Sequence, residues 1–544
     1  MSPTRRDALV QLGALLGLPL VGWPLVGWPL VDGPLTGELR HADDPLAGTI
    51  LQFQVGRARG AYSAAEVTTA ALARCRAGAE LRANDQLADP ARAEARASDA
   101  RAARGALRGP LDGVPLFAKS IYDMQGLPTT ASSAAWAQLF PQAVTRDALE
   151  VQRLRAAGAV LLGKTAADDF AYRGNGTSSL TGQVRNPYDP AGLRTPGGSS
   201  AGSAVVVACG MAFAALGTDD GGSNRIPAQF TGVVGMKPSF GLVPRTGVIP
   251  TWPYLDTHGP LARSVQDAAL MLDVIAGPDA SDGMADRTLY ARGALAALRS
   301  DALVGARLGL VEFHVPRAQM SAESLALFDR AIADCVAAGA IVEAFVPAVN
   351  RADVRDQFAA ASAARGDVAP NHNAPAPTAN ALWRYFAGQG GDAERQVQRG
   401  LAAFRAFYDV LPADWEAMRT LITQPYEADA ASQSFARSRA TAVERLAASF
   451  RAQRIDAMVY PTMPFGAPAA TDPWPDVRTT LGYGNWLGLP EVSVPAGYGG
   501  NGMPAGNLSF VGLPGGDARL LALAHAYEQH ARRFVAPPVP RRES

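Results

Sequence analysis

The stretch from Arg194 to Gly241 constrains the fold of this chain most, because it concentrates glycine and serine around an apolar run. It holds two clusters, Gly197-Gly198-Ser199-Ser200 and Gly221-Gly222-Ser223, and the apolar run between them begins at Ser203. Glycine lets the backbone reach positive φ and bring its N–H groups close to a bound atom. Each cluster therefore offers converging N–H donors and a hydroxyl, which is the equipment that acyl transfer needs.

Lysine is scarce in this chain, and its few positions are informative. The 50 basic residues include only three lysines, Lys119, Lys164 and Lys237, and all of them lie in or near the glycine- and serine-rich region. Arginine keeps its proton in proteins, whereas a buried lysine can lose it, so a base must be lysine rather than arginine. We expect Lys164 and Lys237 to be structural hydrogen-bond donors.

These residues together resemble the amidase signature family, which are serine hydrolases with a Ser–Ser–Lys triad. The glycine- and serine-rich signature is matched over nearly all of Gly197 to Pro238, and the lysine motif is matched at Pro115 to Ser120. The resemblance implies that Ser223 is the nucleophile, that Ser199 is the bridging serine with a cis peptide bond, and that Lys119 is the base.

The resemblance also locates the oxyanion hole and shows where this chain departs from the family. The amides of the oxyanion hole would be those of Asp220, Gly221, Gly222 and Ser223. The departures are Ala201 for a usual Gly, Asp220 for a small or hydroxylated residue, Asn224 for a usual apolar residue, and Thr231 for a frequent Cys. None of them touches the triad. Asp220 and Asn224 flank the nucleophile, so they leave the polarity of the acyl or leaving-group side open.

The expected reaction is hydrolysis of a carboxylic amide C–N bond to a carboxylate plus ammonia or an amine. Lys119, kept neutral by burial, would draw the proton of Ser199, and Ser199 would draw the proton of Ser223 as it attacks the amide carbon. Water would then hydrolyse the acyl-enzyme. Because the lysine must be deprotonated, activity should fall on the acid side of neutrality.

Two other functions compete with this interpretation. Gly198-Ser199-Ser200-Ala201-Gly202 satisfies G-x-S-x-G, the nucleophile elbow of α/β-hydrolases, which would make Ser200 the nucleophile of an esterase. The Arg194-Thr-Pro-Gly that precedes it is a poor candidate for the buried strand that this motif requires. Within the family itself, the main rival is the glutaminase subunit of a tRNA-dependent amidotransferase, which works with partner subunits.

Helix-like and strand-like segments alternate along the chain, which indicates an α/β fold. We expect a single large domain in which a mixed, twisted β-sheet is covered on both faces by helices. The expected strands include 111–119, 159–162, 212–218, 304–311, 340–345, 456–461 and 485–496. The expected helices include 63–75, which opens with the capping box Ser63-Ala-Ala-Glu66, and 89–104, 147–156, 203–211, 321–339 and 517–533.

Composition narrows the partners. The chain has 544 residues, 48% of them hydrophobic and 18% charged, and its net charge is +0. No basic stripe favours nucleic acid, and no paired His or Cys spacing favours a metal site. The three cysteines, Cys75, Cys209 and Cys335, are far apart in apolar stretches and should be buried thiols. We expect a small-molecule amide substrate, no cofactor, and a monomer or homodimer.

The N-terminus begins Met1-Ser-Pro-Thr-Arg-Arg and continues into an apolar segment, which resembles a twin-arginine export signal. Pro19, Pro24, Pro29 and Pro34 interrupt this segment, which disfavours a membrane span. We therefore divide the chain into a signal segment, 1–36, and a catalytic domain, 37–544. A working signal would place the enzyme in the periplasm or outside the cell, and otherwise it would be cytoplasmic.

The sequence gives only a direction for the substrate. Six aromatic residues could suit a hydrophobic or aryl group, or could be ordinary core and surface residues: Trp136, Tyr172, Trp252, Tyr254, Trp383 and Tyr385. The segment 359–400 lacks clear periodicity, and the corresponding part varies most in the family, so it is the candidate for shaping the pocket. Aryl, aliphatic and peptide amides and carbamates all stay open.

Overall fold

A computed structural model of the chain describes residues 44–538 except 190, 290–292, 313–316, 350–352, 355–374, 409–410 and 473–480. Eleven strands within these ranges form one sheet in the order β1-β3-β2-β6-β8-β7-β12-β13-β11-β9-β10. In that order the strands are Asn84–Leu87, Val160–Thr165, Pro115–Lys119, Ala214–Thr218, His258–Ala262, Val234–Lys237, Glu491–Tyr498, Pro504–Val511, Ala457–Pro461, Arg307–Leu310 and Ile341–Ala344. A separate hairpin joins β4 (Thr177–Ser178) to β5 (Gly182–Gln183).

The sheet is mixed, as the alternation of elements predicts. Strand β2 is parallel to β3 and β6, and β9 is parallel to β10 and β11. The strands in the middle pair antiparallel where β6 meets β8, β8 meets β7, β7 meets β12 and β12 meets β13. Most of these strands are buried along their whole length, which is why they are continuous apolar runs rather than alternating ones.

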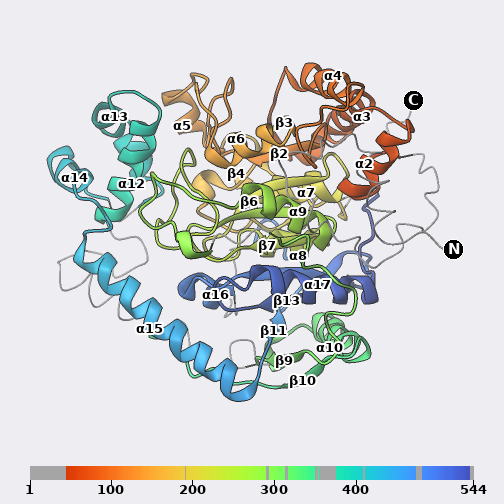
Figure 1. The fold of residues 1–544 in the computed structure, drawn as a ribbon. Coiled ribbons are helices and arrows are strands. Elements are labelled where there is room, and N and C mark those ends of the chain that lie inside the picture. The colour runs from red at the N-terminus through yellow and green to blue at the C-terminus, as the bar shows by residue number, and fades with distance from the viewer. Residues whose placement is uncertain are drawn as a thin grey trace.

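Helices cover both faces of this sheet in a single domain (Figure 1). Helices α7 and α8 pack on each other and on the central strands, and α9 and α17 form a second such pair. Helices α12, α13 and α14 lie beside one another at one side of the sheet, and α15 runs from them toward β11. The helices are α2 (Ile50–Ala58), α3 (Ala64–Ala77), α4 (Ala91–Ala102), α5 (Ala134–Leu139), α6 (Leu149–Ala156), α7 (Ala201–Ala208), α8 (Arg225–Thr231), α9 (Val265–Ile275), α10 (Ala322–Ala337), α12 (Pro375–Gly388), α13 (Ala393–Arg405), α14 (Trp415–Ile422), α15 (Ala430–Gln453), α16 (Leu481–Leu487) and α17 (Asp517–Ala531).

The expected elements are present with shifted ends, and two segments differ. The capping box of Ser63 and Glu66 opens α3 with both of its hydrogen bonds. The predicted strand 485–496 is wrong over its first residues, because 485–487 belong to α16 and β12 starts only at Glu491. The segment 359–400 contains α12 and part of α13 among its described residues, whereas 359–374 lies outside them.

The fold brings together the ends of three strands. Strands β2 and β6 are parallel neighbours, so their carboxyl ends, Lys119 and Thr218, lie at the same edge of the sheet. Strand β8 runs antiparallel to β6 and places its first residue, His258, opposite Thr218. In open α/β sheets, ligands bind outside the carboxyl ends of the strands, so this edge is where a site is expected.

None of the helices in the described part of the chain is both long and apolar enough to cross a membrane. The N-terminal segment 1–36, with its twin-arginine pattern, lies outside the described residues.

Candidate active site

Lys119 ends strand β2 and is fully buried. Its Nζ donates hydrogen bonds to Ser199 Oγ at 2.7 Å and to Thr218 Oγ1 at 2.8 Å. Burial lowers the pKa of Lys119 to about 8, although the acidic residues around it, Asp220 first among them, oppose the shift. The amine therefore loses its proton close to neutral pH while it is held against a serine hydroxyl. Sequence reasoning missed Thr218, whose signal is its place at the end of the strand before Asp219.

Ser199 and Ser200 differ in what their hydroxyls do. The peptide bond between Gly198 and Ser199 is cis, and the Ser199 hydroxyl accepts from the lysine. Ser200 Oγ instead accepts from Thr218 N and donates to Thr218 O, both at 3.2 Å. No strand precedes Ser200 in the described residues 191–199, so the strand-to-helix context of a nucleophile elbow is absent there. The hydrogen bonds of its hydroxyl and the missing strand therefore disfavour Ser200 as a nucleophile.

Ser223 lies in the short loop between β6 and α8, with only 7% of its surface exposed. The backbone of Ser223 is tied to the first cluster, because its carbonyl accepts from Ser200 N at 3.1 Å. Among the described residues, the N–H groups of Asp220, Gly221 and Ser223 donate to no partner, whereas Gly222 N donates to Asp219 Oδ1 at 2.7 Å. Three of the four amides expected in an oxyanion hole are therefore free to receive a ligand.

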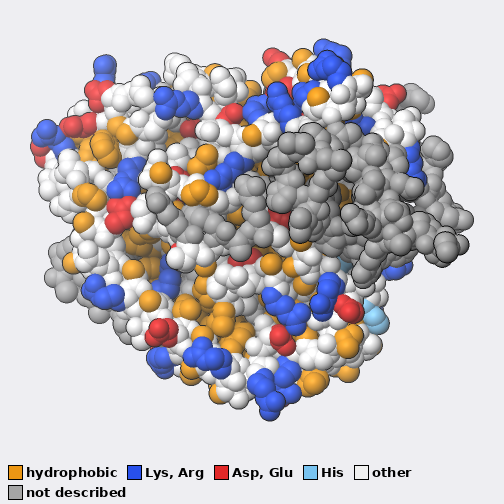
Figure 2. Space-filling view, viewed as in Figure 1, with side chains coloured by type: hydrophobic (Ala, Val, Ile, Leu, Met, Phe, Trp, Pro, Cys, Tyr) orange, Lys and Arg blue, Asp and Glu red, His pale blue; other side chains and the backbone are white. Residues whose placement is uncertain are grey.

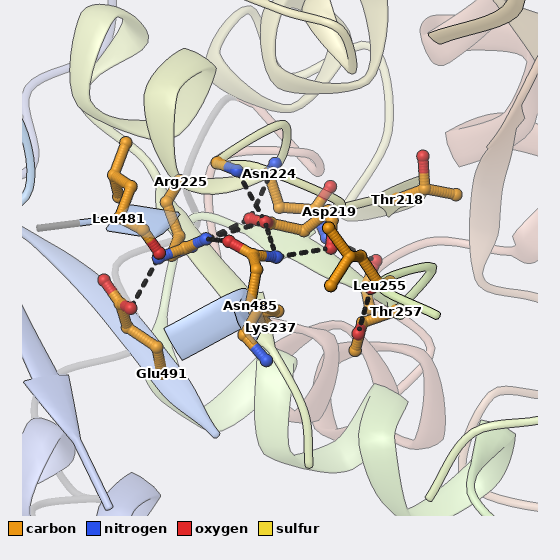
Figure 3. Close-up of polar contacts among 12 residues, drawn as sticks. Thr218, Asp219, Asn224, Arg225, Lys237, Leu255, Thr257, Leu481, Asn485 and Glu491 are labelled. Carbon is orange, nitrogen blue, oxygen red and sulfur yellow. Dashed lines mark hydrogen bonds and ion pairs between the residues drawn. The ribbon is translucent and has the colours of Figure 1, made fainter. Parts of the chain in front are cut away.

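A buried network of ion pairs and hydrogen bonds fixes the loop between β6 and α8 (Figure 3). Arg225 donates from Nε and Nη2 to Asp219, at 2.8 and 2.7 Å, and from Nη1 to Glu491 Oε2 at 2.5 Å. Asn485 Nδ2 also donates to Asp219, at 2.9 Å to its carbonyl and 3.0 Å to Oδ1. Although burial opposes it, Arg225 holds the pKa of Asp219 well below its usual range, so Asp219 stays an ionised acceptor for the loop.

The other two lysines are hydrogen-bond donors to the backbone, as the sequence analysis expects. Lys164 Nζ donates to Pro128 O at 2.7 Å and to Thr129 Oγ1 at 2.9 Å. Lys237 Nζ donates to Pro238 O at 3.2 Å and points away from the Arg225 network (Figure 3). Burial lowers the pKa of both side chains, that of Lys164 to about 8 and that of Lys237 to about 7. Neither lysine bonds to a serine of the two clusters.

The two departures beside the nucleophile face different ways. Asn224 Nδ2 donates to Met236 O at 3.0 Å and to Gly259 O at 3.2 Å, so its side chain ties α8 to the sheet. Asp220 is 3% exposed, and both of its carboxylate oxygens lack a hydrogen-bond donor among the described residues. The side chain of Asn224 is therefore bound to the backbone of the sheet, whereas Asp220 is a buried acid whose oxygens receive no hydrogen bond from the described residues.

Two of the six aromatic residues stand near the nucleophile loop. A Cβ on the exposed Gly221 would lie 3.8 Å from Trp252 Cζ3, and the Trp252 ring meets that of Tyr172 edge-on with centroids 6.0 Å apart. The other four lie elsewhere: Trp136 and Tyr254 are buried in the core, Tyr385 donates to Asp123 Oδ1, and Trp383 is on the surface. Trp252 therefore borders Gly221, and Tyr172 packs against the Trp252 ring to complete an aromatic rim.

A cavity of about 380 Å³ lies between α12 and the loop that precedes β8. Arg384 and Tyr385 of α12 line it together with Asp256 and His258, and the three residues of the predicted triad do not. The described part of the segment 359–400 therefore borders a cavity that none of the three triad residues lines.

The three cysteines are buried free thiols, as expected. Within the described ranges there is no group of three or more His, Cys, Asp or Glu side chains arranged to hold a metal ion. On the face shown in Figure 2, basic, acidic and apolar side chains are mixed over the described part of the surface, and there is no large patch of one charge.

Comparison with known proteins identifies the family. The family model described as Amidase matches residues 66–521. A glutamyl-tRNA(Gln) amidotransferase subunit of Anaeromyxobacter sp. (strain K) is 36% identical over 531 residues, covering 89% of this chain and 96% of that protein. The corresponding subunit of Synechococcus sp. (strain CC9605) is 35% identical over 476 residues, covering 83% and 89%.

Solved structures give the same answer for the fold. The native peptide amidase from Stenotrophomonas maltophilia superposes with a TM-score of 0.69 at 32% identity, covering 91% of this chain and 99% of that one. An amidase family protein from Bacillus anthracis str. Ames superposes with a TM-score of 0.73 at 26% identity, covering 91% and 93%. Fold, site and relatives together define an enzyme that acts on carbon–nitrogen bonds. The chain belongs to the amidase signature family.

Proposed function

We propose that this chain is a stand-alone amidase that hydrolyses a small-molecule amide through an acyl-enzyme on Ser223. Neutral Lys119 takes the proton of Ser199, and Ser199 takes the proton of Ser223 as its oxygen attacks the amide carbon. The same relay then returns a proton to the leaving nitrogen. Water hydrolyses the ester on Ser223 and releases the carboxylate.

The observation that carries this proposal is the 2.7 Å contact between Lys119 Nζ and Ser199 Oγ in a fully buried setting. A lysine in water is protonated at neutral pH, and burial is what makes it available as a base. Lys119 donates to the hydroxyl of Ser199, and the N–H of the next residue, Ser200, donates to the carbonyl oxygen of Ser223. Hydrogen bonds therefore connect the base to the first serine cluster, and the first cluster to the second.

The free amides of Asp220, Gly221 and Ser223 support an oxyanion hole at this loop. Negative charge develops on the carbonyl oxygen as the tetrahedral intermediate forms, and fixed N–H donors stabilise it. Loss of one such donor typically raises the barrier by about 3 kcal/mol. In this structure Gly222 N is engaged by Asp219, so we assign the role to the other three amides.

The substrate direction comes from the rim of Trp252 and Tyr172 beside Gly221. Flat aromatic side chains favour an apolar or aryl group on one side of the amide. The similarity to a peptide amidase adds C-terminal peptide amides to the candidates. We therefore expect activity on aryl amides or on peptide amides that carry an aromatic side chain.

The test is release of ammonia or amine from a panel of aryl, aliphatic and peptide amides, with Ser223→Ala, Ser199→Ala and Lys119→Ala measured beside the parent. The proposal predicts turnover by the parent and loss of turnover in all three variants. Ser200→Ala is the matched control, because among the described residues the Ser200 hydroxyl bonds only to the Thr218 backbone. An inactive Ser200→Ala beside an active Ser223→Ala would contradict the assignment.

A second candidate function is the glutaminase subunit of a tRNA-dependent amidotransferase. Its support is the run of relatives named as glutamyl-tRNA(Gln) amidotransferase subunits, one of them at 36% identity over 89% of this chain. The same serine chemistry would then release ammonia from glutamine for use by a partner protein. Glutaminase activity that appears only when the other subunits are present would favour this function over the stand-alone one.

Export is a further part of the proposal and rests on the sequence of residues 1–36 alone. The pair Arg5-Arg6 before an apolar segment is the feature that a twin-arginine translocase reads. Fusing residues 1–60 to a reporter, with and without Arg5→Lys and Arg6→Lys together, tests it. Reporter in the periplasm that the double substitution abolishes supports export, and reporter that stays in the cytosol contradicts it.

A further inference from the structure

The antiparallel ladder of β6 and β8 brings Asp220 opposite Asp256. Thr218 pairs with His258 in that ladder, and Asp219 N donates to Thr257 O at 2.7 Å one step further on. One step beyond the end of the ladder come Asp220 and Asp256, and the side chains of these two acids lie within hydrogen-bonding reach of each other. In such a ladder the residues on either side of a hydrogen-bonded pair have their side chains close together, with Cβ atoms about 4.5–5.5 Å apart.

The two carboxyl groups differ in their donors. Asp256 accepts from Thr251 N at 3.1 Å and from Trp252 N at 2.7 Å, one bond on each oxygen. Neither oxygen of Asp220 receives an N–H or O–H bond from the described residues, although the residue is only 3% exposed. Burying an ionised carboxylate without hydrogen-bond donors costs free energy, and a second negative charge opposite it raises this cost further. A neutral carboxylic acid in this place can donate its own proton to the carboxylate that faces it.

We propose that Asp220 and Asp256 share one proton, so that Asp220 is a neutral acid and the pair carries a single negative charge beside Lys119. The pair then acts as a positioning element, because its one charge favours the protonated form of the lysine. Together with burial, Asp168 and Asp219, this charge sets the pH at which the lysine becomes a base. This rests on the proposed function, in which Lys119 is that base. Asp220 stands where the family usually has a small or hydroxylated residue, so the acid pair is a feature of this chain rather than of the family pattern.

The groups around the pair agree with one charge rather than two. Burial and the facing Asp256 raise the pKa of Asp220 well above its usual range, and Lys119 opposes that shift. Asp219, which Arg225 keeps ionised, adds a further negative charge near Asp220. Asp168 adds another acidic group that faces Lys119. Two tyrosines and an arginine also lie near the pair, namely Tyr122, Tyr408 and Arg245. Arg245 is already bonded to Asp282 at 2.6 and 2.7 Å, so it does not neutralise a second carboxylate here.

The cavity beside α12 gives this pair a path to solvent. Asp256 lines the cavity, and so do Arg146, Ser281 and Gly388, which are exposed at the surface. The proton that the pair holds can therefore exchange through Asp256 without passing the space in front of Ser223. Asp256 thus lines this cavity and also interacts with the buried lysine.

Infrared spectroscopy tests the shared proton directly and independently of activity. The spectrum of the parent minus that of Asp220→Asn, recorded at neutral pH in D₂O, should contain the C=O stretching band of a protonated carboxylic acid. The control is Asp472→Asn, which removes an exposed aspartate and should subtract only carboxylate bands. If Asp220→Asn also removes only carboxylate bands, Asp220 is ionised and the proposal is overturned.

The pH dependence of kcat/KM tests the effect on Lys119. Asp220→Asn replaces one neutral group by another, so the acid limb of its profile should coincide with that of the parent, whatever happens to kcat. Asp220→Asn combined with Asp256→Asn removes the charge, so the acid limb should move to lower pH by about one unit. An acid limb that already moves in the single variant, or that stays in place in the double variant, overturns the proposal.

The proposed role of Lys119 as the base and the proposed neutral state of Asp220 can be disproved independently of each other. If Lys119→Ala remains active, the lysine is not the base and the proposed function fails, while the infrared band still reports whether Asp220 is neutral. If the double variant does not fold, the spectrum of the single variant decides alone.

Discussion

Arg225 donates two parallel hydrogen bonds to Asp219, from Nε to Oδ2 at 2.8 Å and from Nη2 to Oδ1 at 2.7 Å. Both side chains are fully buried. This fixes the two oxygens of Asp219 that receive the N–H groups of Gly222 and Asn224 on either side of Ser223. The position of the nucleophile loop thus depends on a charge pair that never meets solvent.

Replacing Arg225 by Met should therefore destabilise the whole fold. The change leaves Asp219 and Glu491 as buried charges without their shared partner, and breaking a buried pair in this way typically lowers the free energy of unfolding by about 3–5 kcal/mol. Guanidinium denaturation measures it. Arg299→Met is the control, since Arg299 and Asp301 form an exposed pair that should matter little. Equal stabilities of the two variants would contradict the role of the network.

Thr218→Val should slow catalysis without unfolding the protein. The substitution keeps the shape of the side chain but removes the second acceptor of Lys119 Nζ, so the amine is no longer held against Ser199 from both sides. A hydrogen bond between neutral groups, such as the unprotonated amine and a hydroxyl, is worth about 0.5–1.5 kcal/mol, so kcat should fall about two- to tenfold. Thr218→Ser, which restores a hydroxyl, should recover most of the rate. A Val variant as fast as the parent would show that Thr218 does not orient the lysine.

Activity should rise with pH through a single acid limb near pH 8. Only the neutral form of Lys119 can accept a proton, and its pKa is lowered from 10.5 to about 8, so the active form grows as pH passes through that value. The measurement is kcat/KM from about pH 5 to pH 10, which spans this pKa. Lys119→Arg keeps a positive charge that cannot be lost and should be inactive throughout. Full activity of the parent at the acid end of this range would exclude the lysine as the base.

Lys237→Met should stabilise the protein most at and below pH 7. Burial and Arg225 lower the pKa of Lys237 from 10.5 to about 7, so the unfolded chain binds more protons than the folded one between these values. The lysine therefore disfavours folding fully below pH 7, and this effect fades as pH rises toward 10.5. The stability difference between Lys237→Met and the parent should shrink across this window in guanidinium denaturation. A difference that does not depend on pH would contradict this.

Local pattern was enough to predict the class of fold and the region of the candidate site. The alternation of apolar runs and helical periods predicts the mixed sheet, and strands such as β2 and β6 follow their apolar segments to within a few residues. The chain order of the lysine motif and the two serine clusters, read through their resemblance to a family, predicts that Lys119 and Ser199 come together. The structure joins these two by a hydrogen bond across 80 residues of sequence.

Contacts between distant segments could not be predicted in this way. The Arg225–Glu491 pair joins residues 266 positions apart, and no periodicity marks either as a partner of the other. The predicted strand from Asn485 failed because its apolar residues look alike in a buried helix and a buried strand. Gly488 at φ +67° ends α16 there, and β12 begins after it. The facing of Asp220 and Asp256 likewise depends on strand register, which a single sequence does not reveal.

In the proposed mechanism Ser223 is the nucleophile and Lys119 activates it. Treatment with a serine-directed phosphonofluoridate, followed by mass spectrometry of the digested protein, tests both roles at once, because the reagent bonds covalently to an activated serine. We expect one label, on Ser223, formed at a rate that rises with pH and collapses in Lys119→Ala. A label on Ser200, or labelling of Ser223 at an unchanged rate in Lys119→Ala, would contradict it.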